Sequence, residues 1–290
     1  MRAVPFKQVD VFTDHPFRGN PVAVILDGEG LDGEAMQAIA RWTNLSETTF
    51  VLPPDHPGAS YRLRIFTPRQ ELPFAGHPSV GTAAAVLEAG LAAPVDGRLL
   101  QSCAAGLLPL RVEDGPDGRR IHVQAPPARF AGVVDGDGGR LAAVLGATPL
   151  ATPAPEVVDN GPHWWVCGFA EAATLRGLAP DMGALAGLLL ERGAVGVAAY
   201  APEAGDGWQL AVRCFCPADG IPEDPVTGSG NAAIAAFLHR HGRTPAPTWT
   251  ASQGREVGRD GRLQLQVDAD GAVWVGGRSL TVVDGMVRLG

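Results

Sequence analysis

The pattern of apolar and polar positions divides the chain into many short strands and a few helices. Apolar and β-branched residues cluster or alternate in four early stretches that predict strands, at residues 6–12, 22–26, 48–52 and 61–67. Residues 32–43 carry apolar residues at helical spacing behind Asp32, a favourable N-cap, and predict a helix. The same signals farther along predict strands within 99–112 and at 121–127, 163–168, 196–200, 248–251, 261–267, 273–276 and 279–283, helices at 140–147 and 182–192, and a Pro-rich loop at 148–162.

One sequence pattern occurs twice. Residues 64–84 and 213–233 align without a gap when Arg64 is placed on Arg213. In each copy a short strand leads into a Pro-containing turn, a Gly loop and an Ala-rich helix; the first helix is expected to run from about residue 79 to residue 89. Self-similarity at a long period indicates a chain built twice from one unit, so we expect the two Gly loops to meet at one site. The identical pairs are Arg64/Arg213, Phe66/Phe215, Pro68/Pro217, Pro73/Pro222, Gly81/Gly230, Ala83/Ala232 and Ala84/Ala233.

The length of 290 residues suits one large domain or two of ordinary size, and the repeat favours two. A cluster of turn residues at 114–118 marks the expected crossing between them. The sequence therefore predicts a first domain over 1–116 and a second over 117–278. A C-terminal strand at about 279–290 is expected to return to the first domain.

The composition excludes several classes of protein. The formal net charge is −8 and there is no basic run, which argues against a nucleic-acid surface because phosphate binding needs clustered Lys and Arg. No apolar stretch approaches the roughly 20 residues that cross a membrane, and the first residues lack the features of a signal peptide. Four Cys in a chain of this length are not a disulfide framework. We expect a cytoplasmic protein that binds neither nucleic acid nor membranes.

The two Gly loops are candidates for binding a small anion. The start of a helix presents unpaired backbone N–H groups and the positive end of the helix dipole. Gly76 and Gly81 allow close backbone approach and a positive φ in the first loop. His77 in that loop would either make a structural hydrogen bond or act on a ligand. Asp224, just before the second helix, would either order the loop or hold a catalytic group or a substrate amine.

Two more polar residues are candidates on position alone. Asn20 lies in a Gly-Asn-Pro turn between two predicted strands, where it either serves the turn or offers its amide to a ligand. Glu47 lies where a helix gives way to a strand, and a Glu there is either solvated or catalytic. The residues alone therefore indicate a site for a small carboxylate, in which Glu47, His77 or Asp224 moves a proton.

Other chemistries lack their motifs. His239 and His241 would point to different faces of a helix, and the Cys214/Cys216 pair has no second pair to complete a zinc site. There is no phosphate-binding Walker loop and no Gly-x-Gly-x-x-Gly opening a βαβ unit. Ser229 is one residue short of a nucleophile elbow.

Five segments together resemble the phenazine-biosynthesis PhzF-like isomerase family. They lie in the expected order at 9–14, 19–24, 44–48, 66–78 and 223–231, and read VDVFTD, GNPVAV, NLSET, FTPRQELPFAGHP and EDPVTGSGN. The resemblance implies an α+β, diaminopimelate-epimerase-like fold. This fold has two pseudo-symmetric domains, each with a mostly antiparallel sheet wrapped around a central helix, and the active site in the cleft between them.

The resemblance also implies a chemistry. The family's best-understood member moves a proton between ring carbons of a dihydro-hydroxyanthranilate, without cofactor or metal, through a Glu that acts as general acid and base. That Glu corresponds to Glu47. His77, Asp224 and Ser229 correspond to other polar residues around the substrate, and Gly76 and Gly228 to loop positions near its carboxylate. A homodimer is expected, for which the apolar strands at 164–168 and 195–200 are a possible surface.

Two alternatives differ from this isomerase. The related amino-acid epimerases place a Cys on each Gly loop, where this chain has Ala75 and Thr227, and its own Cys103, Cys167, Cys214 and Cys216 lie elsewhere. A two-Cys racemase is therefore disfavoured. A sensor or partner-binding protein of the same fold would bind a small carboxylate with little turnover. The intact Glu47, His77 and Asp224 favour the enzyme, because a pure binder has no need of all three.

Overall fold

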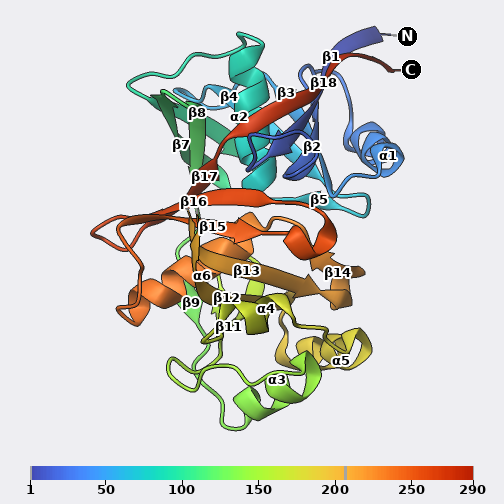
Figure 1. The fold of residues 1–290 in the computed structure, drawn as a ribbon. Helices are drawn as coiled ribbons and strands as arrows, with labels where there is room; N and C mark the ends of the chain where they lie inside the picture. The colour runs from blue at the N-terminus through green and yellow to red at the C-terminus, as the bar shows by residue number, and fades with distance from the viewer. Residues whose placement is uncertain (1, 206–207, 290) are drawn as a thin grey trace. The chain divides into compact units, whose positions relative to one another are not determined.

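The computed structural model describes residues 2–205 and 208–289 and divides into two compact units (Figure 1). The first comprises residues 1–124 and 276–290, the second residues 125–275. The sequence places the crossing near residue 116, but β8 (Gly118–Gln124) forms a hairpin with β7 (Gly106–Gly115) and belongs to the first unit. None of the described helices combines the length and apolar character that a membrane crossing requires.

The first unit is a curved, mostly antiparallel sheet with α2 (Gly76–Glu88) against its inner face (Figure 1). Helix α2 contacts strands from both ends of this sheet and is buried on nearly every side, which explains its run of small and apolar residues. Helix α1 (Gly33–Thr43) packs on β3 and β4, and Asp32 caps it as predicted. The sheet order is β18 (Ser279–Leu289), β1 (Arg2–Val11), β2 (Asn20–Ile25), β3 (Glu47–Leu52), β4 (Tyr61–Phe66), β6 (Arg98–Cys103), β7 and β8, with β5 (Glu71–Leu72) also on β4; the β2–β3 and β4–β6 pairs are parallel.

The C-terminal strand pairs with β1 along almost its whole length, in the first unit as the sequence predicts. The predicted strand at about 279–290 corresponds to β18, which is continuous through Gly285. Gly290, the last residue of the predicted strand, lies outside the described residues.

The second unit repeats the plan around α6 (Gly228–Arg240), which is buried over most of its length. The sequence predicts a start near residues 228–231, which is correct. The remaining strands are β9 (Arg129–Phe130), β10 (Glu156–Asp159), β11 (His163–Gly168), β12 (Gly196–Gly205), β13 (Trp208–Cys216), β14 (Ile221–Asp224), β15 (Thr248–Gln253), β16 (Gly261–Val267) and β17 (Val273–Gly277), the helices α3 (Asp137–Leu145), α4 (Ala172–Arg176) and α5 (Met182–Arg192), and the 3₁₀ turns Pro217–Asp219 and Arg255–Val257.

Two sequence predictions about this unit are wrong. Strand β10 lies inside the predicted 148–162 loop, because pairing with β9 and β11 stabilises a stretch too short to show a local pattern. The strands expected to supply a dimer surface, β11 and the start of β12, are instead buried in the core of the unit. Their apolar character follows from that burial.

The repeated Arg residues make the same contacts in both units. The Arg64 guanidinium binds both carboxylate oxygens of Glu71 at 2.7 Å, and Arg213 binds those of Glu223 at 2.9 and 2.7 Å. Each guanidinium also lies over the Phe two residues on, 5.0 Å from the Phe66 ring and 4.7 Å from the Phe215 ring. The Arg-x-Phe identity of the repeat therefore reflects one bidentate, stacked arrangement built twice.

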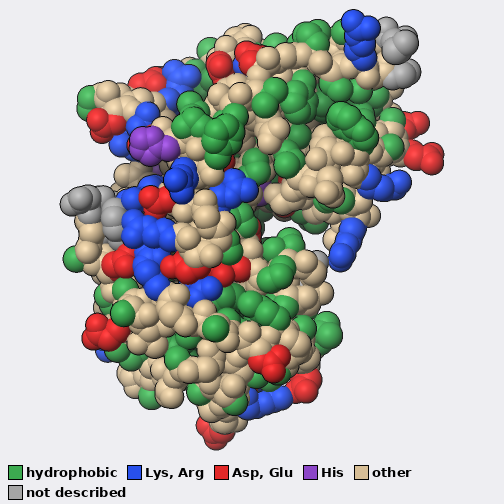
Figure 2. Space-filling model, turned by 45° about the vertical axis from the view of Figure 1, so that its right-hand side comes forward, with side chains coloured by type: hydrophobic (Ala, Val, Ile, Leu, Met, Phe, Trp, Pro, Cys, Tyr) green, Lys and Arg blue, Asp and Glu red, His purple; other side chains and the backbone are tan. Residues whose placement is uncertain are grey.

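Charges on the second unit are largely paired. Arg176 binds both Glu203 and Glu256, and Arg255 binds Asp260. Figure 2 shows acidic and basic side chains interspersed on the face of this unit that it draws.

Candidate active site

Glu47 and His77 meet inside the first unit. Glu47 is the first residue of β3 and His77 is the second residue of α2. The Nε2 atom of His77 lies 3.2 Å from Oε2 of Glu47, and the two side chains are only 9% and 15% exposed. Two candidates that lie 30 positions apart in the sequence thus form one buried acid–imidazole pair.

Burial changes the acidity of Glu47. Loss of solvent raises the pKa of this carboxyl from its ordinary 4.5 to about 7, against an opposing interaction with the Ser46 side chain. A carboxyl with a pKa near neutrality is well suited both to accept and to return a proton. In the sequence, Glu47 is a candidate on position alone. In the structure, the burial of its carboxyl makes it a strong candidate for acid–base chemistry.

Helix α2 begins three residues before the earliest predicted start, so His77 lies in its first turn rather than in a preceding loop. Pro78 is tolerated there, because a first-turn residue has no helical acceptor for the N–H that proline lacks. Gly76 and Gly81 both lie within the helix, so the expected positive φ is wrong for both. Close approach does hold at Gly81, where a Cβ would lie 2.6 Å from Cγ1 of Val22.

Asn20 lies near Glu47 on the face of the sheet that α2 covers. Val22 pairs with Glu47 across β2 and β3, and its side chain points at Gly81 of α2. Since side chains alternate along a strand, Asn20 shares that face two residues from Val22. Asn20 is buried and pairs with Val11 where β1 and β2 form an antiparallel pair, as the turn interpretation expects, while a contact with a ligand stays a prediction.

A buried carboxylate orders the turn before Asn20. Asp10 accepts hydrogen bonds from the backbone N–H groups of Arg18 and Gly19 at 3.0 and 3.2 Å. A Cβ on Gly19 would lie 2.1 Å from the carbonyl oxygen of Val11, so only glycine fits there. The motif residues Asp10 and Gly19 thus act by fixing the chain that leads into Asn20.

The second unit places Asp224, Gly228 and Ser229 together at the start of α6. The Thr227 hydroxyl donates to Oδ2 of Asp224 at 2.6 Å, so Asp224 and Thr227 order the loop through each other. Gly228 is the first residue of α6 and Ser229 the second. The interpretation of Asp224 as a loop-ordering residue is confirmed, while a contact with substrate stays a prediction.

Gln253 holds the loop at 224–231 in place. The sequence alone does not identify this residue as a candidate. Its side-chain oxygen accepts from the Thr227 backbone N–H at 3.0 Å and from the Asn231 amide at 2.8 Å. Its side-chain nitrogen donates to the Asp224 carbonyl and to the Thr227 hydroxyl, each at 2.9 Å. No local signal marks a Gln at the end of a strand as the centre of a loop more than 20 residues away.

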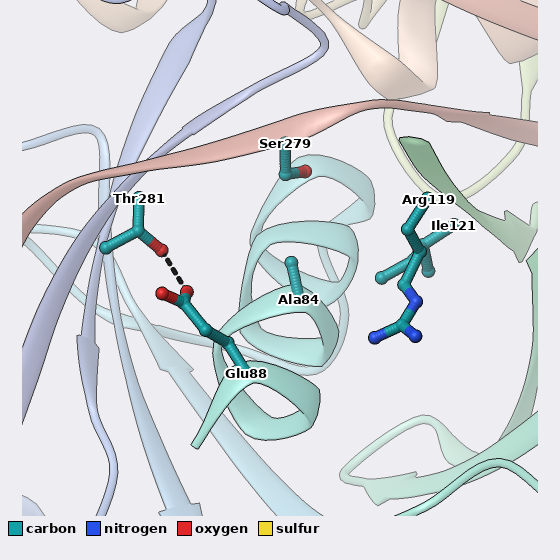
Figure 3. Close-up of a pocket in the computed structure, with 6 residues that line it drawn as sticks. All are labelled: Ala84, Glu88, Arg119, Ile121, Ser279 and Thr281. Atoms are coloured by element: carbon teal, nitrogen blue, oxygen red, sulfur yellow. Dashed lines mark hydrogen bonds between the residues drawn. The ribbon is translucent and has the colours of Figure 1, made fainter. Parts of the chain in front are cut away.

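A surface hollow of about 220 Å³ on the first unit lies apart from these residues (Figure 3). Figure 3 shows Ala84 and Glu88 of α2 between Thr281 on one side and Arg119 on the other. Glu88 ends α2, whereas His77 begins it, and none of the predicted site residues lines the hollow. Over residues 2–205 and 208–289, no group of three or more His, Cys, Asp or Glu is placed to hold a metal ion.

The sequence is similar to known proteins over nearly its whole length. The profile of the family described as Phenazine biosynthesis-like protein matches residues 9–285. Trans-2,3-dihydro-3-hydroxyanthranilate isomerase of Pseudomonas aeruginosa is 37% identical, over 97% of this chain and 98% of the relative. A Schizosaccharomyces pombe protein named Antisense-enhancing sequence 1 is 36% identical over 97% of each chain.

Solved structures show the same fold. The PhzF-family phenazine biosynthesis protein of Bacillus anthracis superposes with a TM-score of 0.87 over all of both chains, at 25% identity. A hydroxyproline epimerase of Agrobacterium vitis, at 15% identity, has a TM-score of 0.63 over 99% of this chain and 92% of its own. The second likeness shows the fold alone. Together they confirm the predicted α+β, diaminopimelate-epimerase-like fold.

Proposed function

Because the chain belongs to the phenazine biosynthesis-like family and is an isomerase of the PhzF type, we propose that it moves a proton within a small cyclic carboxylate, with Glu47 as the general acid and base. The observation that carries this proposal is the buried Glu47 carboxyl, with a pKa of about 7, at 3.2 Å from His77. An ionised Glu47 removes a proton from one substrate carbon. The same carboxyl, now neutral, returns it to another atom of the conjugated system.

His77 supports this cycle from the start of α2. Its ring lies at ion-pair distance from the carboxyl that alternates between charged and neutral forms. The contact at this distance orients the Glu47 carboxyl, so that its reacting oxygen keeps one position through both halves of the proton transfer.

The helix starts favour a carboxylate ligand. Neither N-cap residue, Ala75 of α2 or Thr227 of α6, caps its helix through a side chain. The Thr227 hydroxyl is committed to Asp224 instead. Each helix start, taken by itself, presents the positive end of its helix dipole without a side-chain cap from the N-cap residue, which favours an anionic group there.

The residues at the helix starts argue against a two-Cys racemase. Ala75 and Thr227, which align with the paired Cys of the amino-acid epimerases, occupy equivalent N-cap positions, and neither can exchange a proton as a thiol would. Burial raises the pKa of the Cys167 thiol to about 12, far from the range of a neutral-pH acid or base.

The substrate class is tested by proton NMR in D₂O. The protein is mixed with trans-2,3-dihydro-3-hydroxyanthranilate, the compound named for the Pseudomonas aeruginosa relative, and separately with other small cyclic and amino carboxylates. Deuterium entering a carbon of a cyclic carboxylate is the expected result. Exchange confined to acyclic amino acids would overturn the proposed class, and line broadening without exchange would favour a binding protein with little turnover.

A further inference from the structure

Two side chains, Asn160 from the turn between β10 and β11 and Trp164 from β11, fix Ser229. The indole Nε1–H of Trp164 donates to the Ser229 hydroxyl oxygen at 3.1 Å. The side-chain amide of Asn160 donates to the Ser229 backbone carbonyl at 2.8 Å. Asn160 and Trp164 are each 3% exposed, whereas Ser229 remains partly accessible at the start of α6. The buried pair therefore holds the backbone and the rotamer of an accessible hydroxyl.

The chemistry of indole decides how that hydroxyl is used. An indole nitrogen only donates, so Ser229 must accept from Trp164, and its own hydrogen points elsewhere. In the described part of the chain no protein acceptor takes this hydrogen. Its neighbours at the start of α6 are backbone N–H groups, which are donors themselves. An anionic oxygen of a ligand can accept from the Ser229 hydroxyl and from these N–H groups together, in place of the water that reaches the accessible hydroxyl.

We propose that Trp164 is a positioning residue that fixes Ser229 as a hydrogen-bond donor, so that the start of α6 selects an ionised carboxylate over a neutral amide. Trp164 does not contact the substrate in this account; it acts through Ser229. The inference rests on the proposed function, in which Ser229 contacts the substrate.

Trp165 is a matched control within the same strand. It is fully buried, and its indole N–H makes no hydrogen bond among the described residues. Trp165→Phe therefore removes the same atoms as Trp164→Phe without removing a hydrogen bond. A difference between the two variants reports on the hydrogen bond rather than on packing.

The test is a double-mutant cycle on ligand binding. The dissociation constants of anthranilate and its carboxamide, anthranilamide, are measured by NMR titration for wild type, Trp164→Phe, Ser229→Ala, the double variant and Trp165→Phe. Trp164→Phe is expected to weaken anthranilate binding about 3- to 10-fold and anthranilamide binding much less, as for loss of an ordered donor to a charged group. Its effect is expected to disappear in the Ser229→Ala background.

Each other outcome overturns a specific claim. If wild type does not prefer anthranilate, or Ser229→Ala binds it normally, the proposed substrate contact falls and the inference falls with it. If Ser229→Ala is impaired but Trp164→Phe matches Trp165→Phe, or adds its full effect to Ser229→Ala, the positioning role alone falls. Should Trp164→Phe fail to fold, the Trp164 indole ¹⁵N–H signal replaces it. That signal is expected to shift on anthranilate binding in wild type and not in Ser229→Ala, and equal shifts in both would overturn the positioning role.

Discussion

The Nε2 atom of His77 lies 3.2 Å from Oε2 of Glu47, which ties the first turn of α2 to the first residue of β3. The local sequence around each residue does not predict that the two side chains meet. Their side chains are brought together because α2 packs against the face of the sheet that Glu47 shares with Val22. The pair thus depends on the packing of α2, and the predictions below separate that packing from the chemistry.

Glu47→Gln is predicted to stabilise the fold at alkaline pH. Since the folded-state pKa of about 7 is raised above the ordinary 4.5, folded protein binds the Glu47 proton more tightly than unfolded protein does. The free energy of unfolding therefore falls as pH rises between these values, and the ionised carboxylate costs on the order of 1–3 kcal/mol above about pH 7. Denaturant unfolding at pH 8 and pH 4 measures this. A variant that gains stability equally at both pH values would contradict the raised pKa.

His77→Asn is predicted to lower the isomerase rate by about 10- to 100-fold while the protein stays folded, because it removes the imidazole that orients the Glu47 carboxyl. His56→Asn is the control, since His56 is exposed and its ring nitrogen Nδ1 lies 2.8 Å from the carbonyl oxygen of Pro57. The rate of deuterium incorporation measures the effect. Equal rates in the two variants would remove His77 from the cycle.

Gln253→Ala is predicted to destabilise the second unit by about 2 kcal/mol or more, because it leaves buried donors and acceptors of the 224–231 loop without partners. Gln209 is a suitable control: it accepts one backbone N–H at an exposed position. Thermal unfolding of both Ala variants measures the difference. A Gln253→Ala protein as stable as Gln209→Ala would show that the loop does not depend on Gln253.

Gly81→Ala is predicted to cost about 1–3 kcal/mol of stability and to reduce activity. The added methyl would lie 2.6 and 2.7 Å from side chains of Val22 and Val11, so α2 must shift away from the sheet. Gly138, also in a helix, has nothing within 4 Å of its would-be Cβ, and Gly138→Ala is expected to be neutral or slightly stabilising. Unfolding midpoints that move equally for both would contradict the packing of α2 described here.

The sequence was informative where structure is local. Asp32 caps α1, residues 182–192 form a helix as predicted, and the repeat marks the equivalent central helices. The sequence was misleading where the pairing of strands, rather than a local pattern, decides which residues form a strand and which unit they join. Strand β10 forms because neighbouring strands bind it, and β8 joins the first unit through its hairpin with β7.

The same division holds for the site. Glu47, His77 and Asp224 are visible as candidates because their residue types carry acid–base chemistry. Gln253 and Trp164 are not, because each acts on a loop reached only through the tertiary fold, 26 and 65 residues away along the chain. The raised pKa of Glu47 likewise follows from burial that no local pattern reports.

The most direct test of the central claim is deuterium incorporation by Glu47→Gln beside wild type. Trans-2,3-dihydro-3-hydroxyanthranilate, or the panel compound that exchanges fastest, is incubated with each protein in D₂O. Gln keeps the shape of Glu but cannot carry the proton, so the variant is predicted to bind the compound, unfold like a native protein and exchange at least about 10²-fold more slowly. Exchange within a few-fold of wild type would contradict the assignment of Glu47 as the group that moves the proton.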